Sequence, residues 1–472
     1  MTNVTFQHPE YAKMRETWDL VDDVCAGERR IKEQGEKYLP KPNPADKSPE
    51  NTIRYDQYKK RAVFYNATGR TKKGLVGAAF RKAPTVTVSP VLDYIKKDID
   101  GCGISIYQQS QKAVGETVKK GRCGLLVDYP RTSAPVTKAQ QDAGEIRATI
   151  TLIDAKSIVN WKTANVGSKI MLSLVVIHEC VTEDDAGGFG QNDIQQYRAL
   201  TLQDGVYIIE LYRKSDKDEW HLYDMIQPLD GAGVPWKVIP FTFIGSENND
   251  SSVDESPLYD LASLNLAHYR NSADYEDSVY FTGQPQAWIS GLTEEWRNFL
   301  QTNKIYVGAR SPMLLPINGS FGFAQPQPNS LVKEAMDTKK QDMVSIGARL
   351  VTPGGAAKTA TEAQGDRESE MSVLSLCVSN VSEAYTQAII WMARFMNAPT
   401  KGIEYVISQD FIEAKLDAQM LLALIQLWQT GKYPEGDFWA QLRKYGIIDP
   451  AKTNDMINGE ADSTASGLAL TG

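Results

Sequence analysis

The sequence is poor in the residues from which metal centres, disulfide frameworks and membrane spans are built. Its 472 residues include 5 cysteines, an odd number with no Cys-x-x-Cys pair, and 4 scattered histidines without His-x-x-x-His spacing. The sequence therefore predicts neither a fold stabilised by disulfides nor a zinc hydrolase. No apolar run approaches the ~18 residues of a membrane-spanning helix, and no charged-then-apolar leader opens the chain. We expect a soluble protein, without a membrane anchor, that is made in a reducing cytoplasm.

A surplus of positive charge is also missing. Acidic residues number 59 and basic residues 51, which gives a formal net charge of −8. A high-affinity nucleic-acid binder would carry a basic footprint, although a surface past which DNA slides is not excluded. The exception is the stretch 54–82, where nine Lys and Arg accompany a single acidic residue, Asp56. This basic block is either a DNA-facing patch or, as is usual for such runs, a solvated helix face beside acidic neighbours.

Motifs for catalysis and nucleotide binding are absent as well. Gly121–Gly124 lies after a helix and before a strand, the reverse of the order that a phosphate cradle needs. Thr352–Thr359 superficially resembles a P-loop, but it lacks a glycine directly before Lys358 and has no preceding strand. His178 and Cys180 share one face of an alternating strand, which packing explains better than a metal. We predict no enzyme activity, no cofactor and no metal; an unrecognised enzyme is the weaker alternative.

The first half of the chain predicts helices followed by a mainly antiparallel sheet. Helices are expected from about His8 to Cys25 and over Ser105–Lys120, the second ahead of a short apolar strand, Leu125–Tyr129. From residue 147 onward the period of the pattern changes to two, and Asp204-Gly205 is a strong hairpin signal. The expected strands are 147–153, 170–181, 194–202, 206–212, 219–226 and 238–244, with an edge strand at 86–88. We therefore predict an α+β fold.

The stretch 256–395 predicts three helices, with a Pro- and Gly-rich excursion between the first two. Ser256–Phe281 starts with a capping serine and a proline at the first helical position, and it is nearly polar all round from His268 onward. The second helix, Ser330–Val351, is also sparse in apolar residues and could run back antiparallel to the first. Both helices look built to pack against copies of themselves.

The third helix, expected from Thr361 to Phe395, has two unlike halves. Thr359 and Glu362 fit a capping box, and the first turns after it are polar. An apolar stripe then repeats at spacings of three and four: Met371, Leu374, Val378, Val381, Tyr385, Ala388, Met392 and Phe395. We expect the C-terminal half to be buried and the half next to the glycines to be free; a coiled coil is the alternative. Beyond it, the pattern predicts a strand at 405–407, helices over 411–429 and 434–445, and a disordered tail.

Eight short segments, taken in order, carry a resemblance to a known family. They are Asp100–Ser105, Gly121–Pro130, Ile158–Trp161, Ile239–Gly245, Ser256–Ala262, His268–Asn271, Gly283–Pro285 and Lys358–Glu362. With the order helix, excursion, helix, loop and long helix, the chain resembles the bacteriophage portal proteins, the head-to-tail connectors of tailed phages. No single segment is diagnostic, but together they lie across most of residues 8–450.

The resemblance implies a portal-type multidomain subunit. Its parts would be an α/β wing at 1–250, stem helices at 251–282 and 330–350, a small α/β clip at 283–329, a tunnel loop at 351–360, a long tunnel helix at 361–398, a helical crown-like region at 399–457 and a disordered tail at 458–472.

The resemblance also implies roles for single residues by position. The tunnel loop facing DNA would contain Val351, Thr352, Pro353, Gly354, Gly355 and Lys358, and the cap of the helix behind it Thr359 and Glu362. The candidates for lining the channel of the stem are Arg270, Asp274, Glu276 and Asp277. The clip residues expected to meet terminase or an adaptor are Trp288, Trp296, Tyr306 and Arg310.

By this resemblance the protein would form a ring, typically of twelve subunits, at one vertex of the capsid. In the virion it would remain at this portal vertex. It would be a passive channel for packaging and ejecting double-stranded DNA, and it would be present in the host cytoplasm during assembly. Its expected partners are other copies of itself, terminase, the major capsid and scaffolding proteins, tail and adaptor proteins, and the passing DNA. Many copies of an acidic chain would repel the phosphate backbone and let DNA slide. The alternative is another phage structural or head–tail adaptor protein.

Overall fold

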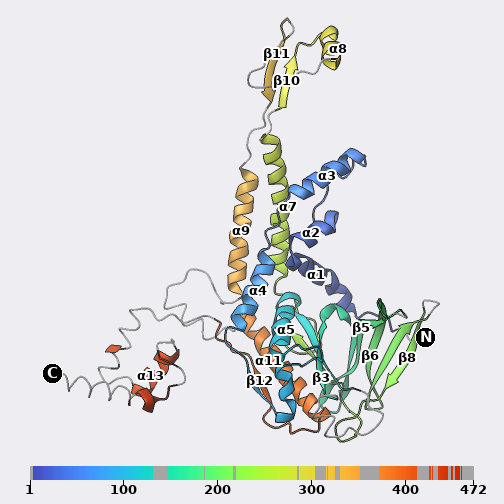
Figure 1. Ribbon diagram of the computed structural model, residues 1–472, viewed down its shortest axis with the longest axis vertical. Helices are drawn as coiled ribbons and strands as arrows, with labels where there is room; N and C mark the ends of the chain where they lie inside the picture. The colour runs from blue at the N-terminus through green and yellow to red at the C-terminus, as the bar shows by residue number, and fades with distance from the viewer. Residues whose placement is uncertain are drawn as a thin grey trace, which may run out of the picture. The chain divides into compact units, whose positions relative to one another are not determined.

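The computed structural model describes residues 4–130, 146–184, 187–215, 219–283, 286–302, 315, 317–324, 330–350, 372–411, 425–426, 428, 434–444, 448–449, 452–457 and 459. They form a mixed α+β fold in which helices precede and follow antiparallel sheets (Figure 1). The chain divides into two units, Met1–Ser408 and Gln409–Gly472. None of the described helices is both long enough and apolar enough to cross a membrane.

Four helices open the first unit: α1 (Pro9–Ala26), α2 (Glu28–Gln34), α3 (Pro49–Arg61) and α4 (Ala67–Ala79). Three of them, α1, α3 and α4, begin with a side-chain cap. The Ser48 hydroxyl accepts a hydrogen bond from the backbone N–H of Asn51, and the Asn66 side chain accepts one from Gly69. The prediction of a helix near 8–25 is confirmed, and the basic block 54–82 forms the last part of α3 and all of α4.

The helix α5 (Ile106–Lys120) leads into the central strand of a three-stranded antiparallel sheet. Ser105 and Gln108 form a capping box at its start, and Gly121 ends it with a φ of 75°. A Cβ atom at Gly121 would lie 2.3 Å from the carbonyl oxygen of Glu255, so this turn requires glycine. The strand order is β3 (Thr149–Asp154), β2 (Arg122–Asp128), β9 (Phe241–Gly245).

A second sheet is a five-stranded antiparallel meander. Its strands, in sheet order, are β4 (Ile158–Val166), β5 (Lys169–Asp184), β6 (Gln191–Gln203), β7 (Val206–Lys214) and β8 (Trp220–Ile226). Asp204 and Gly205, between β6 and β7, have φ angles of 50° and 78°, as the predicted hairpin turn requires. The strand β4 was not among the predicted strands. Its first residues are buried and its last are exposed, so its burial does not alternate as that of a half-buried strand would.

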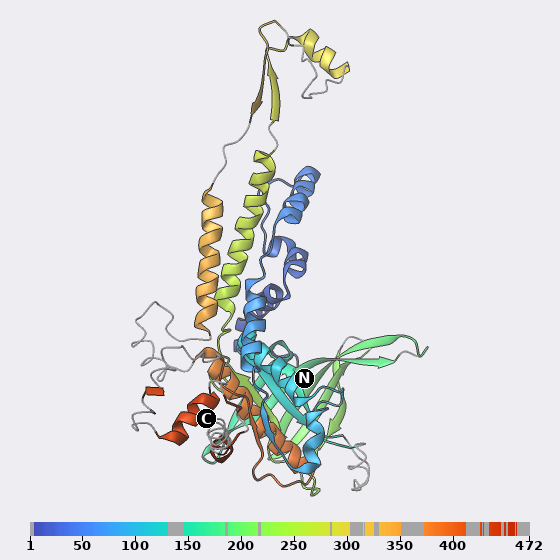
Figure 2. The same ribbon diagram turned by 60° about the vertical axis from the view of Figure 1, so that its left-hand side comes forward.

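Two helices, α7 (Tyr259–Thr282) and α9 (Leu331–Arg349), lie side by side and run in opposite directions (Figures 1 and 2). The predicted start of the first helix at Ser256 is wrong. The Ser256 hydroxyl donates to the carbonyl of Lys119 at 2.6 Å and is not a cap, and Leu258 is the residue before the first helical turn. Between α7 and α9 lie β10 (Gln286–Ser290), α8 (Glu294–Thr302) and β11 (Ser320–Ala324), with β10 and β11 paired antiparallel.

The helix α11 (Val373–Phe395) occupies the core of the first unit. It packs on α5, β2 and β9, and every stripe residue from Leu374 to Phe395 is buried, as predicted. The part of the predicted helix from Thr361 to Met371 lies outside the described residues. Ser372 has extended backbone angles and caps α11 by accepting from the N–H of Ser375, so the helix begins at Val373. A free-standing coiled coil is excluded, because α11 is covered by the chain itself.

Two short strands close this unit. The strand β12 (Glu404–Val406) pairs antiparallel with β1 (Thr85–Thr87), so both predicted short strands exist and are each other's partners. Single turns of 3-10 helix occur at Gly35–Lys37 and Ala155–Ser157, and a longer one at Pro90–Lys96.

The helix α13 (Glu435–Lys444) lies in the second unit and confirms the helix predicted over 434–445. The rings of Trp428 and Phe438 stack at 4.9 Å between centroids. The helix predicted over 411–429 lies almost wholly outside the described residues, as does the predicted tail.

Candidate functional site: the helix pair and its surroundings

The polar side chains of α7 serve first to hold the segment that links α3 to α4. Asn265 is fully buried, and its side-chain oxygen accepts from the backbone N–H groups of Ala67 and Thr68, both at 3.1 Å. The same oxygen also accepts from the Thr68 hydroxyl, while the Asn265 amide donates to the carbonyl of Tyr65 at 2.8 Å. A single amide therefore satisfies the free backbone groups at the start of α4.

About two turns further along α7, Ser272 repeats this arrangement. Its hydroxyl accepts from the N–H of Val63 at 2.8 Å and donates to the carbonyl of the same residue at 2.7 Å. Between these two contacts, Leu266, Tyr269 and Ala273 belong to a buried apolar cluster with residues of α1, α2 and α3. The prediction that polarity of this helix means packing against other copies is therefore wrong for this face of α7, because the chain's own N-terminal helices cover it.

Two of the predicted channel residues are engaged with α3. The Tyr58 hydroxyl donates to Asp274 at 2.6 Å, and Asp277 pairs with Arg61 at 2.6 Å and with Arg54 at 3.3 Å. Burial and then the Asp274 carboxylate raise the pKa of Tyr58 well above its ordinary value, so the phenol keeps its proton. These contacts fix α3 along the C-terminal half of α7.

The other two channel candidates lie on the same helix. Arg270 donates from Nε to the carbonyl of Tyr38 at 3.0 Å, and Glu276 is half-buried. A role in lining a channel stays a prediction for all four residues.

Some side chains of the basic block pair with carboxylates of the same chain. Arg54 and Arg61 pair with Asp277, and Lys72 pairs with Glu116 at 3.2 Å. The guanidinium of Arg70 lies over the ring of Tyr65, 5.3 Å from its centroid. These pairs agree with a helix face beside acidic neighbours, and contact with DNA stays a prediction.

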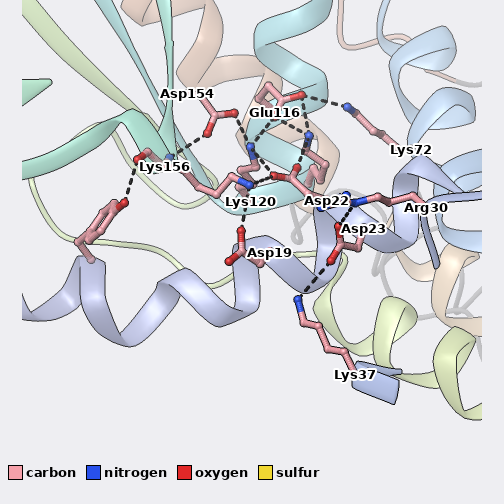
Figure 3. A network of polar contacts seen from close by, with 12 residues as sticks. Asp19, Asp22, Asp23, Arg30, Lys37, Lys72, Glu116, Lys120, Asp154 and Lys156 are labelled. Carbon is pink, nitrogen blue, oxygen red and sulfur yellow. Dashed lines mark hydrogen bonds and ion pairs between the residues drawn. The ribbon is translucent and has the colours of Figure 1, made fainter. Parts of the chain in front are cut away.

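A buried network of ion pairs joins α1, α5 and the end of β3 (Figure 3). Lys120 lies at its centre with 1% of its side chain exposed, and pairs with Asp22 at 3.2 Å, with Glu116 at 3.3 Å and with Asp154. Asp22 also pairs with Lys119 and with Lys156, each at 2.7 Å. The network therefore connects the N-terminal helices α1 and α4 to α5 and to the end of β3.

Asp22, Glu116 and Lys120 of this network stay charged near neutral pH. Burial alone would raise the pKa of Asp22 and of Glu116, but Lys119 and Lys120 more than offset it, and both pKa values fall to about 2. Burial would lower the pKa of Lys120, yet its three carboxylate partners raise it above the ordinary value. A general acid or base needs a pKa near the working pH, so these groups are suited to holding the fold and not to proton transfer.

The other candidates for chemistry are dispersed. Among the residues that the structure describes, no three His, Cys, Asp or Glu side chains gather as a metal ion would need. His178 packs against Tyr197 with ring centroids 4.7 Å apart, and burial lowers its pKa. Cys180, two residues further along β5, is exposed.

The excursion between α7 and α9 presents aromatic side chains. Trp288 on β10 packs over Gly322 on β11, where a Cβ atom would come within 2.7 Å of the indole, yet Trp288 is still 43% exposed. Trp296 and Phe299 on α8 meet edge to face at 5.4 Å. The other two predicted clip residues, Tyr306 and Arg310, lie outside the described residues.

The predicted tunnel loop also lies outside the described residues, together with its cap. These residues are Val351, Thr352, Pro353, Gly354, Gly355, Lys358, Thr359 and Glu362. The described residues on either side of this stretch meet, because the N–H of Leu374 donates to the carbonyl of Leu350 at 3.2 Å.

The helix α9 is covered far less than its neighbours. Within 331–347, where side-chain burial is described, Met343 alone is buried. Leu331 is 68% exposed and Val344 is 69% exposed. Of the elements in contact with α9, α7 is the main one.

Two parts of this site were missed from the sequence. The buried pair Asn265 and Ser272 has no local signal, since its partners lie about two hundred residues earlier. Part of the ion-pair network was visible, because Glu116 stands three and four residues before Lys119 and Lys120 on one helix. Asp22 and Asp154 could not be added to it without the fold.

Comparisons with known proteins give one family match and a set of similar solved structures. Residues 257–396, from the start of α7 to the end of α11, match a family described as "Domain of unknown function (DUF4055)". Among solved structures, the chain is similar to one titled "Virion of native gene transfer agent (GTA) particle", with 17% identity, a TM-score of 0.40, and coverage of 80% of this chain and 89% of that one. It is also similar to "Neck of native GTA particle computed with C12 symmetry", with 16% identity, a TM-score of 0.39 and the same coverage. No curated protein matches the sequence.

Proposed function

We propose that this chain is a portal-type subunit of a phage head-to-tail connector, and that it assembles with copies of itself into a ring around double-stranded DNA. One observation carries the proposal: α9 is a helix of 19 residues with one buried apolar side chain in its described part. A helix so little covered is held by neighbours, and the chain itself supplies chiefly one, α7.

The exposed apolar residues of α9 would become buried in such a ring. Leu331 and Val344 are both more than two-thirds exposed in the single chain. Burying a side chain of this kind is worth ~1.5–3 kcal/mol, and a ring multiplies that gain by its number of interfaces. Each interface of a closed ring joins two different patches of the same subunit, so α9 needs no copy of itself as partner.

The order of the elements supports the assignment of parts. A helix pair, α7 and α9, encloses a small β-hairpin with a helix, and the buried helix α11 follows the pair in the chain. This is the order that the resemblance to portal proteins implies. In it α7 and α9 are the stem, the excursion with Trp288 and Trp296 is the clip, 351–360 is the tunnel loop, and the second unit is crown-like.

In this proposal the protein works passively. Terminase and the tail or adaptor proteins would contact the clip, whose aromatic side chains are available as anchors. The tunnel loop, which contains Lys358, would approach DNA that another machine moves. With a net charge of −8 per chain, the assembled ring would repel the phosphate backbone.

Native mass spectrometry of the full chain tests the assembly. We expect a closed ring of about twelve subunits of 52.4 kDa, as the resemblance implies. Val344→Asp should prevent ring formation and leave the monomer folded, because the residue is exposed in the monomer. The matched control is Ile170→Asp, at a residue of β5 that is 74% exposed, which should still give rings. A chain that stays monomeric at micromolar concentration would contradict the proposal, and a small non-ring oligomer would favour another head–tail structural or adaptor protein.

Deletion of 352–358 tests the role of the channel. Rings should still form, because the anchored part of the structure resumes at Ser372. DNA packaging or retention should fall. Loss of assembly would show that the loop has been misplaced.

A further inference from the structure

The strands β5 and β6 extend beyond the other strands of their sheet. The strand β4 pairs with β5 only as far as Ile177, and β7 pairs with β6 only from Gln196 onward. Residues 180–184 and 191–195 therefore pair with each other alone, and we name them the β5–β6 ribbon. A two-stranded ribbon is at best marginally stable in water, so a surface that covers it would stabilise it.

The end of the ribbon combines an exposed ring with negative charge. Phe189 has a relative exposure of 103%, which means that it touches no other part of the fold. Asp184 accepts from the Gln191 amide and Asp193 from the Thr182 hydroxyl, and neither carboxylate has a cationic partner among the described residues. A fully exposed aromatic side chain is available as an anchor for a partner.

A groove elsewhere in the same unit has the complementary character. It lies between α1, α4 and α5 and has a volume of about 610 Å³. Four lysines and one carboxylate, Asp22, line it, together with small residues such as Ala26 and Gly69. Lys72 and Lys119 are paired with carboxylates, whereas Lys73 and Lys112 are exposed and have no carboxylate partner within the described part of the chain. The groove thus has an apolar floor and a basic rim, and the ammonium groups of Lys73 and Lys112 on that rim are not paired with a carboxylate among the described residues.

A second groove, between α4 and α9, fits less well. Its two cations are Arg70 and Lys340. Both lie over the ring of Tyr65, at 5.3 Å and 5.6 Å from its centroid, so they are already engaged.

We propose that the β5–β6 ribbon of one copy docks in the α1–α4–α5 groove of the next copy, with Phe189 against the apolar floor and Asp184 toward Lys73 and Lys112. Charge complementarity selects a second copy as the occupant, since the same chain presents both the acidic tip and the basic groove. The contact joins two different patches, as a closed ring requires. It rests on the self-assembly in the proposed function and adds an interface outside the helix pair.

Directed cross-linking tests the contact. Phe189→Cys is made in one preparation and Gln111→Cys, at the groove, in another, both with the exposed Cys102 and Cys180 replaced by serine. After the two are mixed, assembled and mildly oxidised, we expect a disulfide-linked dimer that contains one chain of each kind. The matched control replaces Phe189→Cys with Val166→Cys, on the neighbouring hairpin of the same sheet, where Val166 is also exposed. The control should give at least several-fold less product.

A charge exchange sharpens the same test. Lys112→Glu should weaken the cross-link several-fold, and Asp184→Lys added to the partner preparation should restore it. Rings of the expected mass with no more cross-link than the control would overturn this inference and leave the proposed function standing. Absence of any oligomer would overturn both.

Discussion

Two helices of similar length, α11 and α9, have opposite relations to the chain that contains them. Thirteen of the 23 residues of α11 are buried, including every apolar stripe residue that the helix contains. In the described part of α9 the corresponding number is one, Met343. The first helix is buried by the rest of its own chain, whereas most of the described part of the second is exposed, and in the proposed function other copies cover it.

The helix α7 shows why polarity alone does not separate these cases. Its sequence is rich in polar residues, as is that of α9, yet Asn265 and Ser272 are buried. Their partners are the backbone groups of 63–68, so hydrogen bonds take the place of apolar contact. A polar helix is therefore an assembly surface only where its polar groups lack partners in the same chain.

The largest effect is expected from a cavity in the α11 core. Phe395 is 1% exposed, and its ring contacts Trp236 at 4.4 Å and stacks on Tyr129 at 5.5 Å. Phe395→Ala should lower the free energy of unfolding by ~3–5 kcal/mol, measured by urea denaturation. A loss under ~1 kcal/mol would show that α11 is not the helix that the chain itself completes.

A somewhat smaller effect is expected from the ion-pair network, and it should depend on pH. The pKa of Glu116 falls from 4.5 to about 2 in the folded chain, so its contribution is present above about pH 4.5 and is lost as the pH falls toward 2. Glu116→Gln should cost roughly 3 kcal/mol at pH 7 and should flatten the loss of stability between pH 4.5 and 2.

The check is a series of urea titrations across that pH range. Glu404→Gln, at an exposed carboxylate of β12, is the control and should leave the pH dependence unchanged. If the free energy of unfolding of Glu116→Gln and of the original chain had the same dependence on pH, the network would not contribute the predicted pH-dependent stability.

A third prediction concerns the polar packing of α7. Asn265→Ala would leave the N–H groups of Ala67 and Thr68 buried without an acceptor, which should cost about 1–3 kcal/mol. Ser263→Ala, on the exposed face of the same helix, should stay within ~0.5 kcal/mol. Equal effects in urea denaturation would mean that α7 is not held by these hydrogen bonds.

The smallest effect on the single chain is expected from α9. Val344→Ala should change the free energy of unfolding of the monomer by less than ~0.5 kcal/mol, because the residue is 69% exposed. The same change should raise the protein concentration at which rings form, measured by light scattering. A large loss of monomer stability with unchanged assembly would show that the single chain itself, and not other copies, covers α9.

Local patterns in the sequence predicted much of this fold. The stripe from Leu374 to Phe395 predicted the buried helix, and Asp204-Gly205 predicted a turn that requires two positive φ angles. Each of these features depends on residues that are close to each other in the sequence. Features that depend on distant partners were missed. One is the hydrogen bond from the Ser256 hydroxyl to the carbonyl of Lys119, because of which Ser256 does not cap α7.

The candidate site follows the same rule. Trp288 was predicted to be available for contact and is exposed on its strand. Asp277 was predicted to line a channel on the strength of its helix alone, and the structure adds two arginines from α3 that no local pattern reveals. The sparse apolar pattern of α9 was a reliable sign of exposure, whereas the same pattern in α7 was not, since its cover comes from 200 residues earlier in the chain.

Hydrogen–deuterium exchange tests the central claim most directly, by comparing a peptide within 331–347 with one from α11 in the assembled and the dissociated protein. We predict that the α9 peptide exchanges fast in the single chain and is protected in the assembly, while the α11 peptide is protected in both. An α9 peptide that exchanges equally fast in the assembled protein would contradict the claim that other copies cover this helix.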